Sequence, residues 1–284
     1  MDNVIAKPGG AMLNAAVSLG RSDINVSLVT ELGDDSTSVQ IMSFLQSNNV
    51  ATNFIHSYED NNASLAIALL DENKKPKYTF IKNYPDNRNI SKIPDFQNGD
   101  ILLFGSLYSL DKKIRNSILS IVNSAHKQNV KIIYDPNIRN AHHLADDDNM
   151  NSVHQNIKLS NIIKGSDEDF TNIFDSSDHK IQISELRKLN KSALIIITLG
   201  ADGVIADFAG QLIKLPAIET DILSTVGAGD AFNAGIISAL EQQKFKNKRL
   251  KNLQLDSLKD VLDEGLKYSA LVCSTLDNYI PKEL

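Results

Sequence analysis

The chain has 284 residues, 42% of them hydrophobic, which is enough to bury a large core and excludes a disordered protein. Its net charge of −6 argues against nucleic acid as the principal partner, because such a partner needs a face of clustered Lys and Arg. The single cysteine, Cys273, excludes an intramolecular disulfide framework, and the apolar runs are too short to cross a bilayer. We therefore expect a cytoplasmic protein with no nucleic-acid and no membrane partner.

Two adjacent glycines, Gly9 and Gly10, lead into an apolar helical segment that carries Asn14. Glycines let the backbone approach a ligand closely, because no Cβ stands in the way. Directly after this pair, we interpret Asn14 as a ligand contact. The alternative is a polar residue that the helix tolerates.

The segment 50–83 differs from the rest of the chain, because two β-like runs, Ala63–Leu70 and Lys77–Lys82, flank a polar turn. A strand pair that projects over a site would act as a lid and keep water away from a reactive donor. The alternative is an ordinary edge hairpin. If two such lids pack together, the protein is a homodimer through the lid.

From about residue 100 onward, apolar runs alternate with helical patterns, as is typical of parallel strands joined by crossover helices. The predicted strands are Ile101–Gly105, Lys131–Tyr134, Asn161–Ile163, Ala193–Thr198, Val204–Asp207 and Gln211–Leu215, the last pair forming a hairpin across Ala209-Gly210. The predicted helices are Asp111–Gln128, Ser184–Leu189, Ala228–Gln242 and Asp256–Leu276. The unbroken run Leu194-Ile195-Ile196-Ile197 indicates a strand that is buried on both faces.

Arg139 comes just after one of these strands, where its guanidinium can bind phosphate oxygens through two hydrogen bonds. The alternative is a surface ion pair with the cluster Asp146-Asp147-Asp148, which itself indicates the start of a helix. The residue types leave both interpretations open.

The segment from Ser224 to Asn233 places Gly227-Ala228-Gly229-Asp230 at the start of a predicted helix. Backbone N–H groups at a helix N-terminus form a site for developing negative charge, and an Asp beside them can accept a proton from an attacking hydroxyl. The combination suits phosphoryl transfer. Alone, these four residues also fit a plain loop followed by a helix cap.

Four motifs in order resemble the ribokinase/PfkB family of carbohydrate kinases. They are Pro8–Gly20 with Leu32-Gly33-Asp34-Asp35, then Asp135-Pro136-Asn137-Ile138-Arg139, Thr198–Val204 and residues 221–235. The resemblance implies a Rossmann-like three-layer α/β/α fold of the ribokinase type over residues 1–284. In this fold, residues 50–83 contribute the β lid.

The resemblance further implies a phosphotransferase that uses ATP and Mg²⁺ and has an alcohol group as acceptor. A fructokinase-like activity on a primary hydroxyl of fructose or a related ketose is the leading expectation. Ribose, 2-keto-3-deoxygluconate and nucleosides stay open as acceptors. A catalytically weak sugar- or nucleotide-binding protein is the alternative from a different functional class.

Residue roles follow from the positions that match the family motifs. Asp230 falls at the catalytic base, and the amides of Gly227, Ala228 and Gly229 fall at the anion hole. The predicted substrate contacts are Gly9, Gly10, Asn14, Arg139 and Asp230. The predicted ATP contacts are Ser166, Thr198, Gly200, Gly203, Gly227 and Gly229. For Thr198, a strand-end hydroxyl that bonds its own loop is the alternative.

The chain departs from the family pattern in three places. Family members usually have a first β-strand that contributes an Asp to the sugar site, whereas only seven residues precede Pro8 here, and Asp2 lies too close to Gly9 to take that role. Ser224 stands where the family commonly has Asp, so we predict no firm monovalent cation site. The family's Asn-x-x-Glu reads Ser166-Asp167-Glu168-Asp169, in which Asp169 keeps a carboxylate for Mg²⁺ or, alternatively, belongs to a helix cap.

Overall fold

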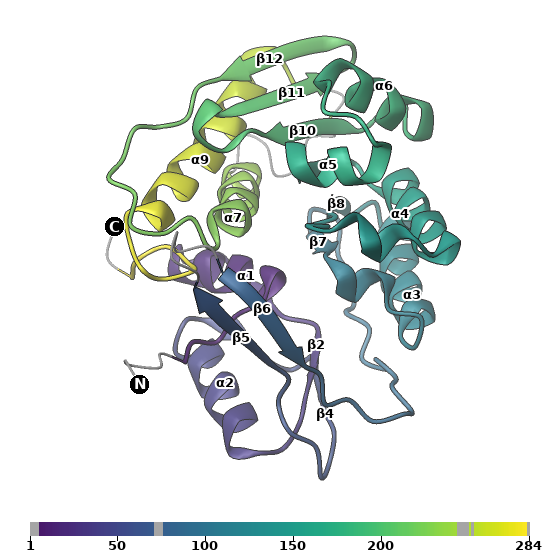
Figure 1. The fold of residues 1–284 in the computed structure, drawn as a ribbon, viewed down its shortest axis with the longest axis vertical. Helices are drawn as coiled ribbons and strands as arrows, with labels where there is room; N and C mark the ends of the chain where they lie inside the picture. Colours follow the sequence, from purple (N-terminus) through teal and green to yellow (C-terminus); the bar gives the residue numbers. More distant parts are fainter. Residues whose placement is uncertain (1–5, 71–75, 243–249, 251–252, 283–284) are drawn as a thin grey trace.

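The structure is a computed structural model that describes residues 6–70, 76–242, 250 and 253–282. Its centre is a six-stranded sheet with the order β12-β11-β10-β9-β8-β7 (Figure 1). The strands are β7 (Ile101–Gly105), β8 (Lys131–Asp135), β9 (Ile162–Ser166), β10 (Leu194–Thr198), β11 (Val204–Phe208) and β12 (Gln211–Leu215). Strands β7 to β10 are parallel, and β11 and β12 are antiparallel neighbours. The sheet is therefore mixed, and the predicted β11–β12 hairpin is present.

Helices cover both faces of the sheet (Figure 1). On one side lie α1 (Ala11–Arg21), α7 (Ala228–Glu241) and α9 (Leu255–Cys273); on the other lie α3 (Arg115–Lys127), α4 (Asp147–Leu159), α5 (Asp167–Phe174) and α6 (His179–Leu189). Strand β10 serves both cores, because Leu194 and Ile196 pack in one apolar cluster and Ile195 and Ile197 in the other. The strand is buried on both faces, as predicted, and the fold is the expected three-layer α/β/α arrangement.

Two glycines let α7 and α9 pack against each other at close range. A Cβ at Gly235 would lie 2.4 Å from the backbone oxygen of Glu264, and one at Gly265 would lie 2.9 Å from the Phe232 ring. Larger residues at either position would push the helices apart. Helix α7 is thereby fixed in the core, and its N-terminus is the Gly-Ala-Gly-Asp segment.

Several predicted boundaries are wrong by a few residues. Helix α3 begins at Arg115 rather than Asp111, because Leu107–Leu110 form a short 3-10 helix, η1, before it. Helix α6 begins at His179, where Asp178 caps it, rather than at Ser184. Strand β9 continues to Ser166, past the predicted end at Ile163. The acidic cluster does open a helix, since the Asp146 side chain accepts a hydrogen bond from the Asp148 amide in the first turn of α4.

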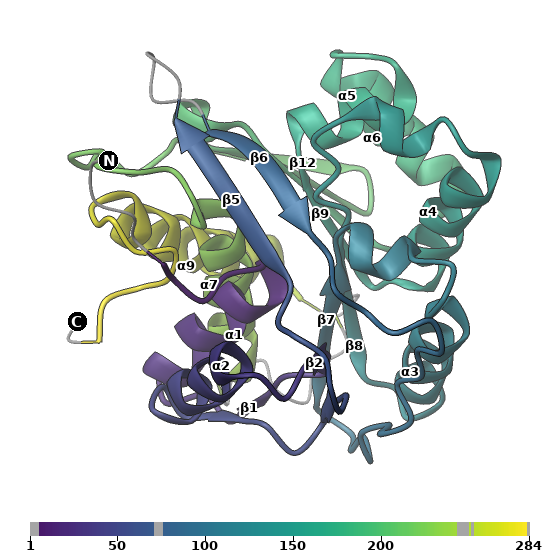
Figure 2. The same ribbon diagram turned by 60° about the horizontal axis from the view of Figure 1, so that its bottom comes forward.

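The N-terminal part adds small sheets beside the main one. Strand β1 (Val26–Ser27) pairs with β3 (Val50–Ala51), and β2 (Thr30–Leu32) pairs with β4 (Ile55–Ser57), with α2 (Ser36–Gln46) between them in the chain. Strands β5 (Leu65–Leu70) and β6 (Pro76–Ile81) form a separate antiparallel pair. Figures 1 and 2 both show this pair as a ribbon alongside α1, apart from the six-stranded sheet. Helix α1 is the first element of the described residues, and Asp2 lies outside them.

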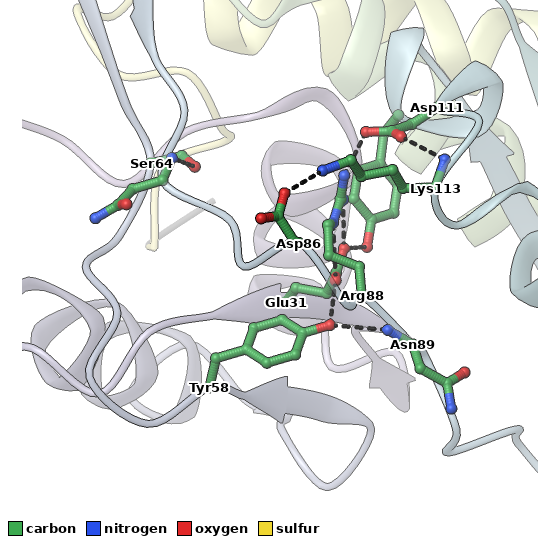
Figure 3. Close-up of polar contacts among 10 residues, drawn as sticks. Glu31, Tyr58, Ser64, Asp86, Arg88, Asn89, Asp111 and Lys113 are labelled. Carbon is green, nitrogen blue, oxygen red and sulfur yellow. Dashed lines mark hydrogen bonds and ion pairs between the residues drawn. The ribbon is translucent and has the colours of Figure 1, made fainter.

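A buried polar cluster joins β2 and the segment after β6 to η1, which follows strand β7 of the main sheet (Figure 3). Arg88 donates to both carboxylate oxygens of Glu31 on β2, at 3.1 and 2.6 Å. Tyr58 and Tyr108 donate their hydroxyls to the same carboxylate at 2.6 and 2.7 Å. Arg88 also pairs with Asp111, at the end of η1. The cluster, which we call the lid-base cluster, ties β2 and the return segment after β6 to the main body.

Burial works against the charge on Glu31, but the hydrogen bonds from Arg88, Tyr58 and Tyr108 outweigh it and lower the pKa of Glu31. Burial beside Glu31 raises the pKa of Tyr58 to about 12. The cluster therefore stays a charged pair with neutral phenols at physiological pH.

Among the described helices, none has both the length and the apolar character needed to span a bilayer.

Candidate active site

The N-termini of α1 and α7 meet and bring together two motifs that lie far apart in the sequence. The Asn14 side-chain amide, on α1, donates a hydrogen bond of 2.8 Å to Oδ2 of Asp230, on α7. Gly10 is the residue before α1 and has a φ of 123°, a conformation that favours glycine. Asn14 thus contacts the candidate base itself, and the idea that it is merely tolerated on its helix is wrong.

Gly227 forms the turn into α7 with a φ of 86°, in the left-handed region. A Cβ there would lie 2.2 Å from the backbone oxygen of Asn278, so the C-terminal loop packs directly against this turn. No side chain of the described residues caps the helix N-terminus. The Ala228 amide donates a hydrogen bond of 3.3 Å to the Thr225 oxygen within the turn. This predicted anion-hole amide therefore already has a partner. The helix N-terminus still provides the partial positive charge that an anion needs.

Burial, together with the nearby charge of Asp135, raises the pKa of Asp230 to about 7. The hydrogen bond from Asn14 and the charges of Lys164 and Arg139 act in the opposite direction. A carboxylate with a pKa near neutrality is both partly ionised and basic enough to take a proton at physiological pH. The environment of Asp230 therefore suits a general base.

A buried ion pair lies directly beneath the first turn of α7. The Lys164 ammonium is 2.9 Å from Oδ2 of Asp135, and the same nitrogen is 3.2 Å from the backbone oxygen of Gly229. Asn233 donates to Oδ2 of Asp135 at 2.6 Å. Lys164 was not among the predicted site residues, and it lies just beyond the predicted end of its strand at Ile163. The signal available was a lone cation and a lone carboxylate at the ends of neighbouring parallel strands.

The predicted nucleotide residues lie at the carboxyl edge of the sheet. Ser166 and Thr198 are direct partners in the register of β9 and β10. The Thr198 hydroxyl is 3.4 Å from the Gly165 oxygen on the neighbouring strand, rather than bonded to its own loop. Gly200 has a φ of 57° and open space where a Cβ would be, whereas a Cβ at Gly203 would lie 2.1 Å from the Leu215 oxygen. Gly203 is thus required by the turn itself, and Gly200 is open toward solvent.

Asp169 completes a capping box at the start of α5, so the helix-cap interpretation is correct. The Asp169 amide donates to the Ser166 hydroxyl at 3.1 Å, and the Ser166 amide donates to Oδ2 of Asp169 at 2.8 Å. Its other oxygen, Oδ1, is buried without a partner among the described residues. Burial and the charge of Asp135 raise the pKa of Asp169. One oxygen of this carboxylate is therefore left over for a cation.

Arg139 is exposed, and its Nε donates to the Asn137 side chain at 2.9 Å. The alternative, an ion pair with Asp146–Asp148, is wrong, because Lys112 holds both Asp146 and Asp148 at 2.8 Å. Arg139 lies close enough to Asp230 to lower its pKa. Gly9 is also exposed and lies beside the C-terminal loop. A Cβ placed on Gly9 would lie 3.8 Å from the side-chain nitrogen of Asn278. The predicted residues thus gather around the α1 and α7 N-termini and the sheet edge.

The sequence is similar to those of known proteins. Residues 2–279 match the pfkB family carbohydrate kinases. The chain belongs to this family. A fructokinase from Vibrio alginolyticus is 26% identical to this kinase over 237 residues, which make up 83% of the chain and 77% of the relative.

Two solved structures share the fold of this kinase. Fructokinase from Vibrio cholerae O395, with fructose, ADP and a calcium ion bound, gives a TM-score of 0.85 at 20% identity and covers 96% of this chain and 87% of its own. Aminoimidazole riboside kinase from Salmonella enterica, complexed with aminoimidazole riboside and an ATP analog, gives a TM-score of 0.82 at 21% identity. This match covers 98% of this chain and 89% of that kinase. The predicted family and the ribokinase-like fold are confirmed, and the protein is a carbohydrate kinase.

Proposed function

We propose that this kinase transfers the γ-phosphoryl group of ATP to a primary hydroxyl of fructose or a related ketose. Asp230 accepts the hydroxyl proton, the sugar oxygen forms a bond to the γ-phosphorus, and the bond to the bridging oxygen of ADP breaks. The observation that carries this proposal is the carboxylate of Asp230, held by Asn14 at the open N-terminus of α7 with a pKa of about 7. Charge that develops on the phosphoryl oxygens is stabilised by the N–H groups of residues 227–229, of which that of Ala228 exchanges its 3.3 Å turn bond to the Thr225 oxygen for the phosphoryl group.

ATP would lie along the carboxyl edge of the sheet. In this proposal Ser166, Thr198 and Gly200 contact the phosphates and ribose, with Gly203 shaping their turn. Arg139 reaches toward the transferred group, where a guanidinium suits phosphate oxygens. The related fructokinase structure has both ADP and fructose bound, which supports a site that takes a nucleotide and a sugar.

The Mg²⁺ ion would be held jointly by the nucleotide and the protein. Among the described residues there is no ready-made cluster of three metal ligands. Asp169 fits a supporting role, because its Oδ1 has no partner and Mg²⁺ is usually held by one or two carboxylates together with substrate phosphates. When bound, the ion would neutralise charge on the phosphoryl oxygens.

The acceptor side is formed by Gly9, Gly10 and Asn14, beneath strands β5 and β6. We propose that these strands close over the acceptor as a lid and that two lids pack together in a homodimer. The fructokinase relatives favour a ketose acceptor. The similarity to aminoimidazole riboside kinase keeps ribosides as competing acceptors. A protein that only binds its ligands is disfavoured, because Asp230 and the anion-binding turn are intact.

The test is an ADP-release assay with MgATP and a panel of fructose, ribose, 2-keto-3-deoxygluconate, glucose, adenosine and aminoimidazole riboside. We expect release with fructose to exceed release with every other acceptor. In Asp230→Asn, turnover should fall by about 10²- to 10⁴-fold, because the general base is lost, while ATP binding persists. Near-normal turnover in this variant contradicts Asp230 as the base. Greater release with another acceptor contradicts the ketose assignment alone.

A further inference from the structure

The buried pair Lys164–Asp135 has no place in the reaction as described so far. Its side chains are 4% and 2% exposed, so the pair lies almost wholly out of water. Such a pair stabilises a fold little, because the loss of hydration offsets the attraction between the charges, and apolar residues of similar volume often serve as well. Its place beneath the anion-binding turn therefore requires another explanation.

The first turn of α7 is held through two consecutive backbone carbonyls. The Ser269 hydroxyl, from α9, donates to the Ala228 oxygen at 2.9 Å, and the Lys164 ammonium, from β9, donates to the Gly229 oxygen at 3.2 Å. In a trans peptide, the carbonyl and the N–H of the next residue point in opposite directions. Holding these two carbonyls fixes the two peptide planes and with them the direction of the N–H groups of Gly229 and Asp230 at the helix N-terminus.

We propose that Lys164 is a positioning residue for phosphoryl transfer, which orients the anion-binding amides and Asp230 by holding the Gly229 carbonyl. This inference rests on the proposed function of the α7 N-terminus. Asp135 positions the lysine in turn, and Asn233 holds Asp135 from the next turn of α7 at 2.6 Å. The three side chains thus link β8 and β9 at the sheet edge to the helix that carries the base.

The size of residue 229 agrees with this role. A Cβ on Gly229 would lie 3.1 Å from the Lys164 nitrogen, closer than nearly all such contacts. A side chain at this position would require the ammonium to shift by a few tenths of an ångström relative to the carbonyl that it holds. Glycine leaves the lysine in place, although its own backbone lies in an ordinary helical turn.

Lys164 also acts on the charge of Asp230. The groups that influence the pKa of Asp230 are Asn14 on α1, Asp135 at the end of β8, Lys164 on β9 and Arg139 in the loop after β8. Lys164 favours the ionised form, and Asp135 disfavours it. The loss of Lys164 should therefore move the acidic limb of the pH–rate profile to higher pH, and the loss of Asp135 should move it to lower pH.

The decisive experiment compares Lys164→Met with the double variant Lys164→Met/Asp135→Asn. The single variant leaves the Asp135 charge buried without its partner, so it should lose stability. The double variant is neutral and keeps an oxygen for Asn233, so it should recover most of that stability. If Lys164 only stabilises the fold, kcat should recover with the stability. If it positions α7, kcat should stay about 10²-fold below wild type, while KM for ATP changes by less than about threefold.

The matched control is a charged pair outside the site. Arg187, on α6, pairs with Asp207, on β11, and the Arg187→Met/Asp207→Asn variant should change stability without lowering kcat. As a second readout, Lys164→Met should move the acidic limb of kcat/KM upward by about one pH unit and Asp135→Asn should move it downward. A limb that stays in place would contradict the effect of the Lys164 and Asp135 charges on Asp230.

Two results would overturn the inference. One is a folded double variant with kcat within about twofold of wild type; the other is an acidic limb that does not move in the single variants. Asp230→Asn, assayed beside these variants, separates this failure from a failure of the proposed function. If Asp230→Asn is inactive and the double variant is active, only the role of Lys164 is wrong.

Discussion

The lid-base cluster and the cluster beneath α7 are both built around a buried cation and carboxylate, but they differ in how completely their polar atoms are bonded. In the lid-base cluster, both oxygens of Glu31 have partners, two from Arg88 and one from each tyrosine. In the cluster beneath α7, Asp135 uses Oδ2 for both Lys164 and Asn233, and its Oδ1 has no partner among the described residues.

The same deficit recurs around the candidate base. Buried side-chain oxygens of Asn14, Asp169 and Asn233 also lack partners in the described part of the chain, whereas no atom of the lid-base cluster does. Buried atoms without a partner among the described residues also occur away from the candidate base, on Arg115, Tyr134, Asn156 and Gln182. The comparison teaches that the lid-base cluster is complete without a ligand, while the cluster beneath α7 leaves polar atoms that a ligand can satisfy.

Removal of the cation from the lid-base cluster should have the largest effect on stability. Arg88→Met leaves Glu31 buried with a charge and only its two tyrosine partners. We expect a loss of about 3–5 kcal/mol in the free energy of unfolding, measured by urea denaturation. Tyr58→Phe, which removes one neutral donor, is the matched control and should lose about 1 kcal/mol. A loss in Arg88→Met no larger than in the control would mean that this cluster is not the structural one.

Substitution of the candidate base should raise the free energy of unfolding, whereas substitution of Arg88 should lower it. The folded-state pKa of Asp230 is about 7, above the ordinary value of 3.8, so the folded protein binds the extra proton and stability falls as pH rises between these values. Asp230→Asn should therefore be more stable than wild type at pH 8, by about 2 kcal/mol once partial exposure is allowed for. Thermal unfolding from pH 4 to pH 8 measures this gap, which should widen with pH. A gap that is constant or negative would contradict the raised pKa.

The smallest expected effect concerns the strands above the lid-base cluster. If β5 and β6 close over the acceptor while the cluster stays fixed, their amides should gain protection from hydrogen exchange by about tenfold at saturating acceptor. The amides of β2 and β4, beside Glu31, should not change and serve as the internal control. Equal changes in both regions would mean that the cluster moves with the strands, and no change in either would favour an ordinary edge hairpin.

The sequence predicted the elements whose pattern is local. The apolar run of β10, the β11–β12 hairpin and the start of α7 at Ala228 follow from neighbouring residues, and the structure confirms them. The predicted ends of helices and strands were wrong where a capping or buried polar residue, rather than the apolar pattern, sets the boundary. The strand β9 continues past its predicted end at Ile163, because Lys164 is buried with Asp135 as its partner.

That partner was not visible in the sequence. Lys164 and Asp135 are 29 residues apart, and Glu31 and Arg88 are 57 apart, so neither pair could be read from spacing. The family motifs singled out both Asn14 and Asp230 as site residues. They did not predict that Asn14 holds Asp230 directly, because the contact depends on how α1 packs against α7.

The pH dependence of kcat/KM for the acceptor tests the central claim, that Asp230 is the base, most directly. Because the base acts in its ionised form, kcat/KM should rise about tenfold per pH unit at low pH and level off with an apparent pKa near 7. In Asn14→Ala this limb should move to higher pH, since the hydrogen bond from Asn14 lowers the pKa of Asp230. A limb near pH 4 in the wild type, or one that does not move in Asn14→Ala, would contradict the assignment of Asp230 as the base.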